Sequence, residues 1–168
     1  MLDGYPTKET AQKLFHALDI DCRAWFFSNY YSVSPGMLSQ FPGIGAFYVI
    51  AFSYSDCQPL TGGTNYKLNL PKDVPAANFW SLTLYEAANA SGLANGHPFL
   101  SLGSRDNPVQ NADGSTDLYL GPEVPDGQEK NWLATVPGRG YFTLLRLYGP
   151  TEAALIKTWI LRDLTKVR

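Results

Sequence analysis

Apolar and polar side chains alternate in several short runs after residue 45, and a period of two is typical of half-buried β-strands. In one run Tyr66, Leu68 and Leu70 share a face, and Lys67 and Asn69 share the other. The runs expected to form strands are Ala46–Asp56, Asn65–Pro71, Phe79–Glu86, Ser115–Pro122 and Gly140–Pro150. Several strands separated by turn residues favour an antiparallel β-sandwich, so the expected fold class is mainly β.

Near the N-terminus the hydrophobic period is that of a helix. Thr7 is a candidate N-cap, and a side-chain stripe recurs every three or four residues to near Tyr30. The stripe consists of Ala11, Leu14, Phe15, Leu18, Cys22, Trp25, Phe26 and Asn29. We expect it to cover apolar surface of the sandwich, in the same chain or in a partner's. A second, short helix is expected over residues 149–157, with Pro150 at its start.

The expected organisation is therefore an N-terminal helical segment, residues 1–35, and a β-sandwich domain, residues 36–168, in one compact unit. The length and the composition agree with one compact, ordered unit. A length of 168 residues suits one domain, and 45% apolar with only 17% charged residues argues against disorder.

Charge and hydropathy exclude two classes of partner. A net charge of −2 favours neither nucleic acid nor an anionic membrane surface. No apolar run is long enough to cross a bilayer, and no signal peptide opens the sequence. We expect a soluble protein, cytoplasmic if the chain is complete.

The segment Asn111–Pro122 raises the question of a metal site, because oxygen-bearing side chains occupy alternate positions. A calcium loop of the EF-hand type needs glycine at its sixth position and an acidic residue at its twelfth, but Gly114 is fourth and Pro122 twelfth. Asp113-Gly114 instead suits a tight hairpin turn with positive φ at both residues. Cysteine and histidine are too scarce for an ordinary zinc site. We expect no metal and no cofactor.

Catalytic signatures are weak. The sequence contains no GxSxG, P-loop or GxGxxG motif. Ser104 and Asp106 lie near His97 in sequence, but chain proximity alone does not make a catalytic triad. His97 is therefore either a surface-loop histidine or a catalytic base, and Cys57 is a weak candidate nucleophile.

Arg146 is the most informative charged residue. It shares a predicted strand face with Phe142, Leu144 and Tyr148, and an unpaired buried guanidinium would be costly. One interpretation is an ion pair, with Asp117 or Glu86. The other is a ligand-facing arginine, because its planar fork suits a carboxylate. In that case Trp80, Tyr85 and Trp132 either line the cavity, together with Tyr148 and His97, or belong to the core.

Several spaced motifs resemble a known family. They are Asn65-Tyr66, Phe79-Trp80-Ser81, the Asn-Ala-Asp-Gly turn at Asn111, Asn131-Trp132 and the stretch Arg146–Pro150. From about Gly43 to Trp159 the chain resembles the domain of unknown function 1214. That domain is the C-terminal half of the bacterial domain of unknown function 1254/1214 proteins. The opening segment is similar to the helical start of that family's N-terminal domain. The resemblance implies a jelly-roll-like sandwich and no settled activity.

The leading hypothesis is a non-catalytic module that binds a small organic or carbohydrate-like ligand on an aromatic-lined face. The alternative is a metal-independent hydrolase or isomerase that uses Arg146 with a carboxylate or with His97. A third interpretation is a structural partner, with a homo-oligomer as one form of it, because the aromatic stretch from Trp25 to Tyr31 leaves apolar surface over.

Overall fold

The computed structural model describes residues 41–97 and 99–167. The chain divides into two units, Met1–Gln40 and Phe41–Arg168, and the architecture below is that of the second. The helix expected over residues 1–35, with its stripe from Ala11 to Asn29, lies outside the described residues.

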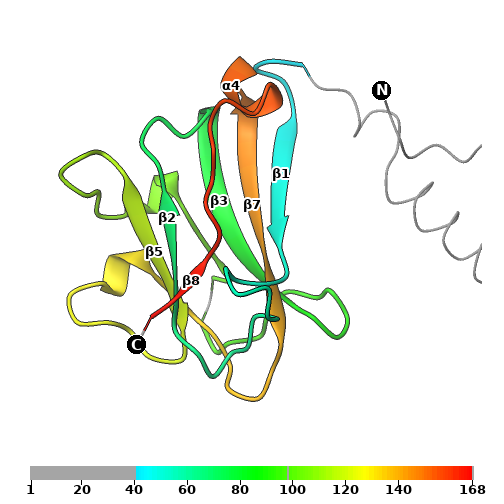
Figure 1. The fold of residues 1–168 in the computed structure, drawn as a ribbon, viewed down its shortest axis with the longest axis vertical. Helices are drawn as coiled ribbons and strands as arrows, with labels where there is room; N and C mark the ends of the chain where they lie inside the picture. The colour runs from blue at the N-terminus through cyan, green and yellow to red at the C-terminus, as the bar shows by residue number, and fades with distance from the viewer. Residues whose placement is uncertain (1–40, 98, 168) are drawn as a thin grey trace, which may run out of the picture. The chain divides into compact units, whose positions relative to one another are not determined.

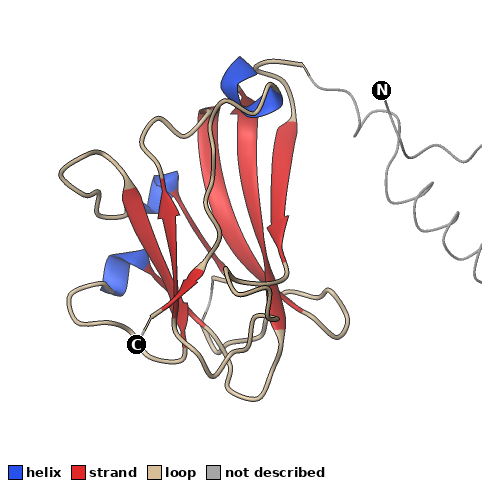
Figure 2. Ribbon diagram, in the orientation of Figure 1, coloured by secondary structure: helices blue, strands red, loops and turns tan. Residues whose placement is uncertain are grey.

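The second unit is a sandwich of two four-stranded sheets (Figure 1). The first sheet consists, in order, of β1 (Ala46–Ala51), β7 (Tyr141–Pro150), β3 (Ala76–Glu86) and β4 (Ser101–Gly103). The second consists of β6 (Trp132–Ala134), β5 (Thr116–Gly121), β2 (Tyr66–Leu70) and β8 (Thr165–Lys166). Helix is confined here to three short turns, η1 (Ser104–Asp106), η2 (Glu129–Asn131) and α4 (Glu152–Leu155) (Figure 2). The mainly β fold predicted from the alternation is confirmed.

Leucines from both sheets fill the space between them. Alternation puts every second residue of a strand on the inner face, and these positions are no more than 2% exposed. They are Leu68, Leu70, Leu82, Leu84, Leu118, Leu120, Leu145 and Leu147. Because full burial of one leucine contributes about 1.5–3 kcal/mol, this layer is the main source of stability in the sandwich.

The sandwich is not wholly antiparallel, which corrects the expectation from sequence. Five of the strand pairs are antiparallel, but β5 and β6 run parallel, with Tyr119 opposite Trp132. The side chain of Asn131 explains this register. Its Nδ2 donates to the carbonyl oxygens of Val109 and Asp117, each at 2.8 Å, and so holds the start of β6 beside β5. Sequence alternation does not reveal strand direction in a run as short as β6.

The Asp113-Gly114 segment forms a tight turn that leads into β5. The backbone N–H of Gly114 donates to the Asn111 carbonyl at 2.9 Å, and Gly114 has φ of 83°. Two details differ from the expected hairpin. Of the two residues Asp113 and Gly114, only Gly114 has positive φ. Residues 107–111, which precede the turn, do not form a strand.

The side chain of Asp113 is used inside this turn. Its Oδ1 accepts from the hydroxyl of Ser115 at 2.6 Å and from the Ser115 backbone N–H at 2.9 Å. These bonds, the side-chain one first, hold the pKa of the Asp113 carboxyl below its ordinary value. Within residues 41–97 and 99–167, no group of three or more His, Cys, Asp or Glu side chains could hold a metal ion.

The late helix is shorter than expected. It covers Glu152–Leu155, while Pro150 is the last residue of β7. Across the described part of the chain, no helix is both long and apolar enough to span a membrane.

Candidate functional site

Arg146 lies on the outer face of the first sheet, near the middle of β7. Along this strand Tyr141, Thr143, Leu145 and Leu147 are buried against the core, whereas Phe142, Leu144, Arg146 and Tyr148 are half-buried on the other face. The shared face predicted for Arg146 is therefore formed. It points away from the second sheet.

The guanidinium of Arg146 reaches across to β3. Its Nη1 donates to the Thr83 hydroxyl at 2.9 Å, and its Nη2 donates to the Tyr85 hydroxyl. The guanidinium carbon also lies 5.5 Å from the ring centre of Tyr85 and 5.9 Å from that of Tyr48 on β1. These are cation–π distances, so the charge is bordered by one ring on each neighbouring strand.

The ion pairs expected for Arg146 are formed by other cations. Asp117 lies 3.6 Å from the amine of Lys67, and Glu86 lies 3.4 Å from Arg139. As far as the described residues show, Arg146 makes no ion pair. The physical reason is position, because Asp117 belongs to the other sheet and Glu86 faces the loop before β7.

Aromatic rings extend around Arg146 on this side of the sheet. Tyr85 stacks on Phe142 with ring centres 5.3 Å apart, and Phe79 stacks on Tyr148 at 4.1 Å. At the β1 side Tyr48 is 45% and Phe52 is 62% exposed, so this surface is open. We call it the aromatic face, defined by Tyr48, Phe52, Phe79, Tyr85, Phe142 and Tyr148 around Arg146.

The other predicted site residues lie elsewhere. Trp80 occupies the inner face of β3, is 7% exposed and belongs to the hydrophobic core. Trp132 is on β6 of the second sheet, where its indole N–H donates to the Gly121 carbonyl at 3.1 Å. His97 packs edge-on against Trp132 with ring centres 5.4 Å apart. Of the six predicted ligand-binding residues, the structure brings together Arg146, Tyr85 and Tyr148.

The candidate triad residues have structural partners. The Ser104 hydroxyl accepts from the backbone N–H of Trp80 at 3.2 Å, and an oxygen of Asp106 accepts from the Gly103 N–H at 2.7 Å. Both bonds fix η1 against β3 and β4. Cys57 is an exposed free thiol in a turn.

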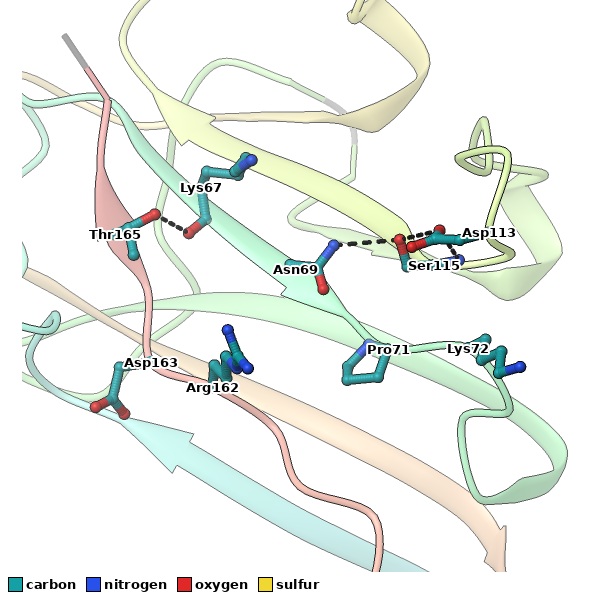
Figure 3. Close-up of a pocket in the computed structure, with 9 residues that line it drawn as sticks. All are labelled: Lys67, Asn69, Pro71, Lys72, Asp113, Ser115, Arg162, Asp163 and Thr165. Atoms are coloured by element: carbon teal, nitrogen blue, oxygen red, sulfur yellow. Dashed lines mark hydrogen bonds between the residues drawn. The ribbon is translucent and has the colours of Figure 1, made fainter.

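A second candidate site lies beside β2, and the sequence analysis did not identify it. It is an open groove of about 640 Å³ (Figure 3). Its lining residues are Lys67, Asn69, Pro71, Lys72, Asp113, Ser115, Arg162, Asp163 and Thr165. The sequence contains a partial signal for this groove, because the alternation puts Lys67 and Asn69 on a polar strand face and the Asp113 turn is also polar. The third side, from residues 162–165, carries no motif.

Comparison with known protein families gives a match over more than half of the chain. The family described as "Protein of unknown function (DUF1214)" matches residues 45–152, from the start of β1 into α4. The chain belongs to the DUF1214 family. This match confirms the resemblance seen in the sequence, and it includes Arg146 and all six rings of the aromatic face. No curated protein matches the DUF1214 chain.

Two solved structures share the fold. The VPA0106 protein from Vibrio parahaemolyticus is 22% identical with a TM-score of 0.67, and the alignment covers 89% of this chain and 35% of that one. An uncharacterised protein from Burkholderia cenocepacia is 16% identical with a TM-score of 0.54, covering 81% of this chain and 34% of that one. The DUF1214 chain thus spans about a third of the length of each structure.

Proposed function

We propose that this DUF1214 domain is a non-catalytic binding module whose aromatic face takes a small organic ligand that bears a carboxylate. One observation carries the proposal. The guanidinium of Arg146 sits among open aromatic rings and is held by two neutral hydroxyls. Hydroxyls fix its orientation without neutralising its charge, so an anion can still be attracted to it.

The surrounding rings define the rest of the ligand. Charge-assisted hydrogen bonds contribute about 1.5–3 kcal/mol each, and ring contacts add about 0.5–1.5 kcal/mol beyond the area that they bury. An aromatic carboxylate would use both, with its ring against Tyr48 or Tyr85. A sugar acid is the carbohydrate-like form of the same proposal, because the open rings of Tyr48 and Phe52 also offer flat surfaces.

A hydrolase or isomerase has less support. That alternative needs Arg146 beside a carboxylate or beside His97. The bonds of Arg146 go to Thr83 and Tyr85, while His97 packs on Trp132 of the second sheet. A homo-oligomer has some support, because Tyr48 and Ile50 on edge strand β1 are 45% and 51% exposed, and Phe52, directly after the strand, is 62% exposed. Light scattering distinguishes a monomer from an oligomer. We also propose that the strands of the sandwich are connected as in a jelly roll, as the family resemblance implies.

The test is a titration of the full chain with 4-hydroxybenzoate and with its neutral amide, 4-hydroxybenzamide, followed by amide chemical shifts. We expect the carboxylate to shift residues of β1, β3 and β7, and the amide to bind at least about tenfold more weakly. Arg146→Met should weaken carboxylate binding by a similar factor. Arg139→Met makes the same charge change outside the aromatic face and should bind like the wild type.

Denaturant unfolding of the same variants separates binding from folding. Arg146→Met removes two hydrogen bonds to groups that water can still reach, so we expect a loss of only about 1–2 kcal/mol. A loss several times larger would indicate a structural role. Equal binding of the carboxylate and its amide, or unchanged binding by Arg146→Met, would overturn the proposed function.

A further inference from the structure

The groove beside β2 is a second candidate site, and its lining residues are not those of the aromatic face. It lies between β2, the Asp113 turn and the segment that leads into β8 (Figure 3). Its volume of about 640 Å³ is in the usual range for small-molecule sites, about 300–1,000 Å³. Its lining contains no aromatic ring, so the groove does not suit the flat ligand proposed for the aromatic face.

The acidic groups on the β5 side of the groove are already engaged. Asp113 accepts two hydrogen bonds from Ser115 within its own turn. The neighbouring Asp117 accepts from Nδ2 of Asn69 at 2.7 Å and lies 3.6 Å from the amine of Lys67. Asp117 is therefore paired with a cation, whereas Asp113 is held by neutral donors of its own turn.

Two cations of the groove have no such partner. Within the part of the chain that the structure describes, neither Lys72 nor Arg162 forms an ion pair. Figure 3 shows the side chain of Arg162 directed toward β2, below Asn69, and the side chain of Lys72 beyond Pro71, with its amine directed away from Arg162. After the hydrogen bonds of the turn, Lys72 contributes to the lowered pKa of the Asp113 carboxyl, but the two groups are not at ion-pair distance. A guanidinium and an amine that are both outside an ion pair favour an anion.

Neutral polar groups and one further carboxylate line the remaining walls. The Nδ2 of Asn69 is used by Asp117 and Ser115, and its Oδ1 points away from Ser115, to the side where Arg162 and Pro71 lie (Figure 3). Thr165 adds a hydroxyl, and Asp163 adds a carboxylate at the far end. Acceptors and donors spaced along an open groove match a ligand with several hydroxyls better than a bare anion.

We propose that this groove binds an acidic sugar, a polyol that carries one carboxylate or phosphate group. The anionic group lies at Arg162, Lys72 adds positive charge beyond Pro71, and the hydroxyls contact Asn69, Thr165 and Asp163. A carboxylate and a phosphate present the same chemistry to these cations, so both sources are tested.

The experiment titrates the full chain with glucuronate, glucose 6-phosphate, glucose and inorganic phosphate, followed by calorimetry and amide chemical shifts. We expect one or both acidic sugars to bind, and to shift residues 67–72 and 161–166. Glucose and inorganic phosphate should each bind at least about tenfold more weakly, because each offers only half of the required groups. Raising the salt concentration should weaken binding, because the cations are open to solvent.

Matched variants locate the site. Arg162→Met should weaken binding of the acidic sugar about tenfold or more and Lys72→Met by a smaller factor, while Arg139→Met should not change it. Equal binding of glucose, or unchanged binding by Arg162→Met, overturns the proposal, and so does the lack of binding by either acidic sugar. If inorganic phosphate binds as well as glucose 6-phosphate, the polyol part of the proposal is wrong. Arg162→Met should leave 4-hydroxybenzoate binding intact, so this site and the aromatic face can fail independently.

Discussion

At the scale of single residues, Tyr141 stands out because its buried hydroxyl is unsatisfied. The side chain is 1% exposed, and no hydrogen-bond partner for its oxygen occurs among the described residues. Burial, with a smaller contribution from Tyr66, raises the pKa of Tyr141 far above the ordinary 10.0. An unsatisfied buried hydroxyl costs about 1–3 kcal/mol, so Tyr141 is a point where stability can be gained.

Tyr141→Phe should therefore keep or raise the free energy of unfolding at neutral pH, by up to about 1 kcal/mol. The gain should grow at alkaline pH. Because the folded-state pKa is raised, the stability linked to neutral Tyr141 is complete below pH 10.0 and is lost as the pH rises above it. Urea unfolding at pH 8 and near pH 11 measures both effects.

The matched control is Tyr66→Phe. Tyr66 is equally buried, at 1%, but its hydroxyl accepts from the Thr61 N–H at 3.3 Å. Its loss should cost about 1 kcal/mol, which is the opposite sign. If Tyr141→Phe destabilises as much as Tyr66→Phe, the Tyr141 hydroxyl has a partner and the prediction is wrong.

The residues of the aromatic face show what a sequence reveals of a site. Strand alternation correctly grouped Arg146 with Phe142 and Tyr148, because the period of two fixes which side chains share a face. It also put Trp80 and Tyr85 on opposite faces of one strand, so both could not line one cavity, and Trp80 belongs to the core. The sequence did not show which face of β7 is buried in the sandwich, because β7 is rich in apolar residues on both faces.

At the scale of elements, the approach of two loops depends on Gly62. Its N–H donates to the Arg139 carbonyl at 2.8 Å, and its own carbonyl accepts from the Thr135 hydroxyl at 2.7 Å. A Cβ at this position would lie 2.6 Å from the Val136 carbonyl carbon and closer still to its oxygen. Backbone atoms cannot move aside as a flexible side chain can.

Gly62→Ala should thus lower the free energy of unfolding by about 1–3 kcal/mol or more. The adjacent Gly63 is a close control, because a Cβ there meets nothing within 4 Å. Gly63→Ala should be neutral or slightly stabilising, since alanine restricts the unfolded chain. Equal thermal melting of the two variants would contradict the close approach at Gly62.

The long strands were predictable from sequence, whereas the short ones were not. Residues Tyr66–Leu70 and Thr116–Gly121 alternate clearly because one face of each is buried. Strands β6 and β8 contain three and two residues, which is too few to show a period. Their pairing is set by distant contacts, such as Asn131 with Asp117, that a local pattern does not contain.

At the scale of the whole molecule, we predict that folding needs no calcium or zinc. The Asp113 carboxylate is committed to Ser115 in its turn, and that turn lacks calcium-ligand spacing. Thermal melting of the full chain should be the same with and without a chelator, within about 1 °C. A decrease of more than about 5 °C, equivalent to one kcal/mol or more, would contradict this.

The order of strands in the first sheet also bears on how the protein is made. The strand at its centre, β7, pairs with β1 from Ala46 opposite Tyr148 to Ala51 opposite Thr143, and it pairs with β3 on its other side. A ribosome therefore releases β1 and β3 long before it makes the strand that joins them. Until then both expose apolar side chains, and closing such long loops slows folding. The nascent chain should consequently depend on chaperones until β7 has been synthesised.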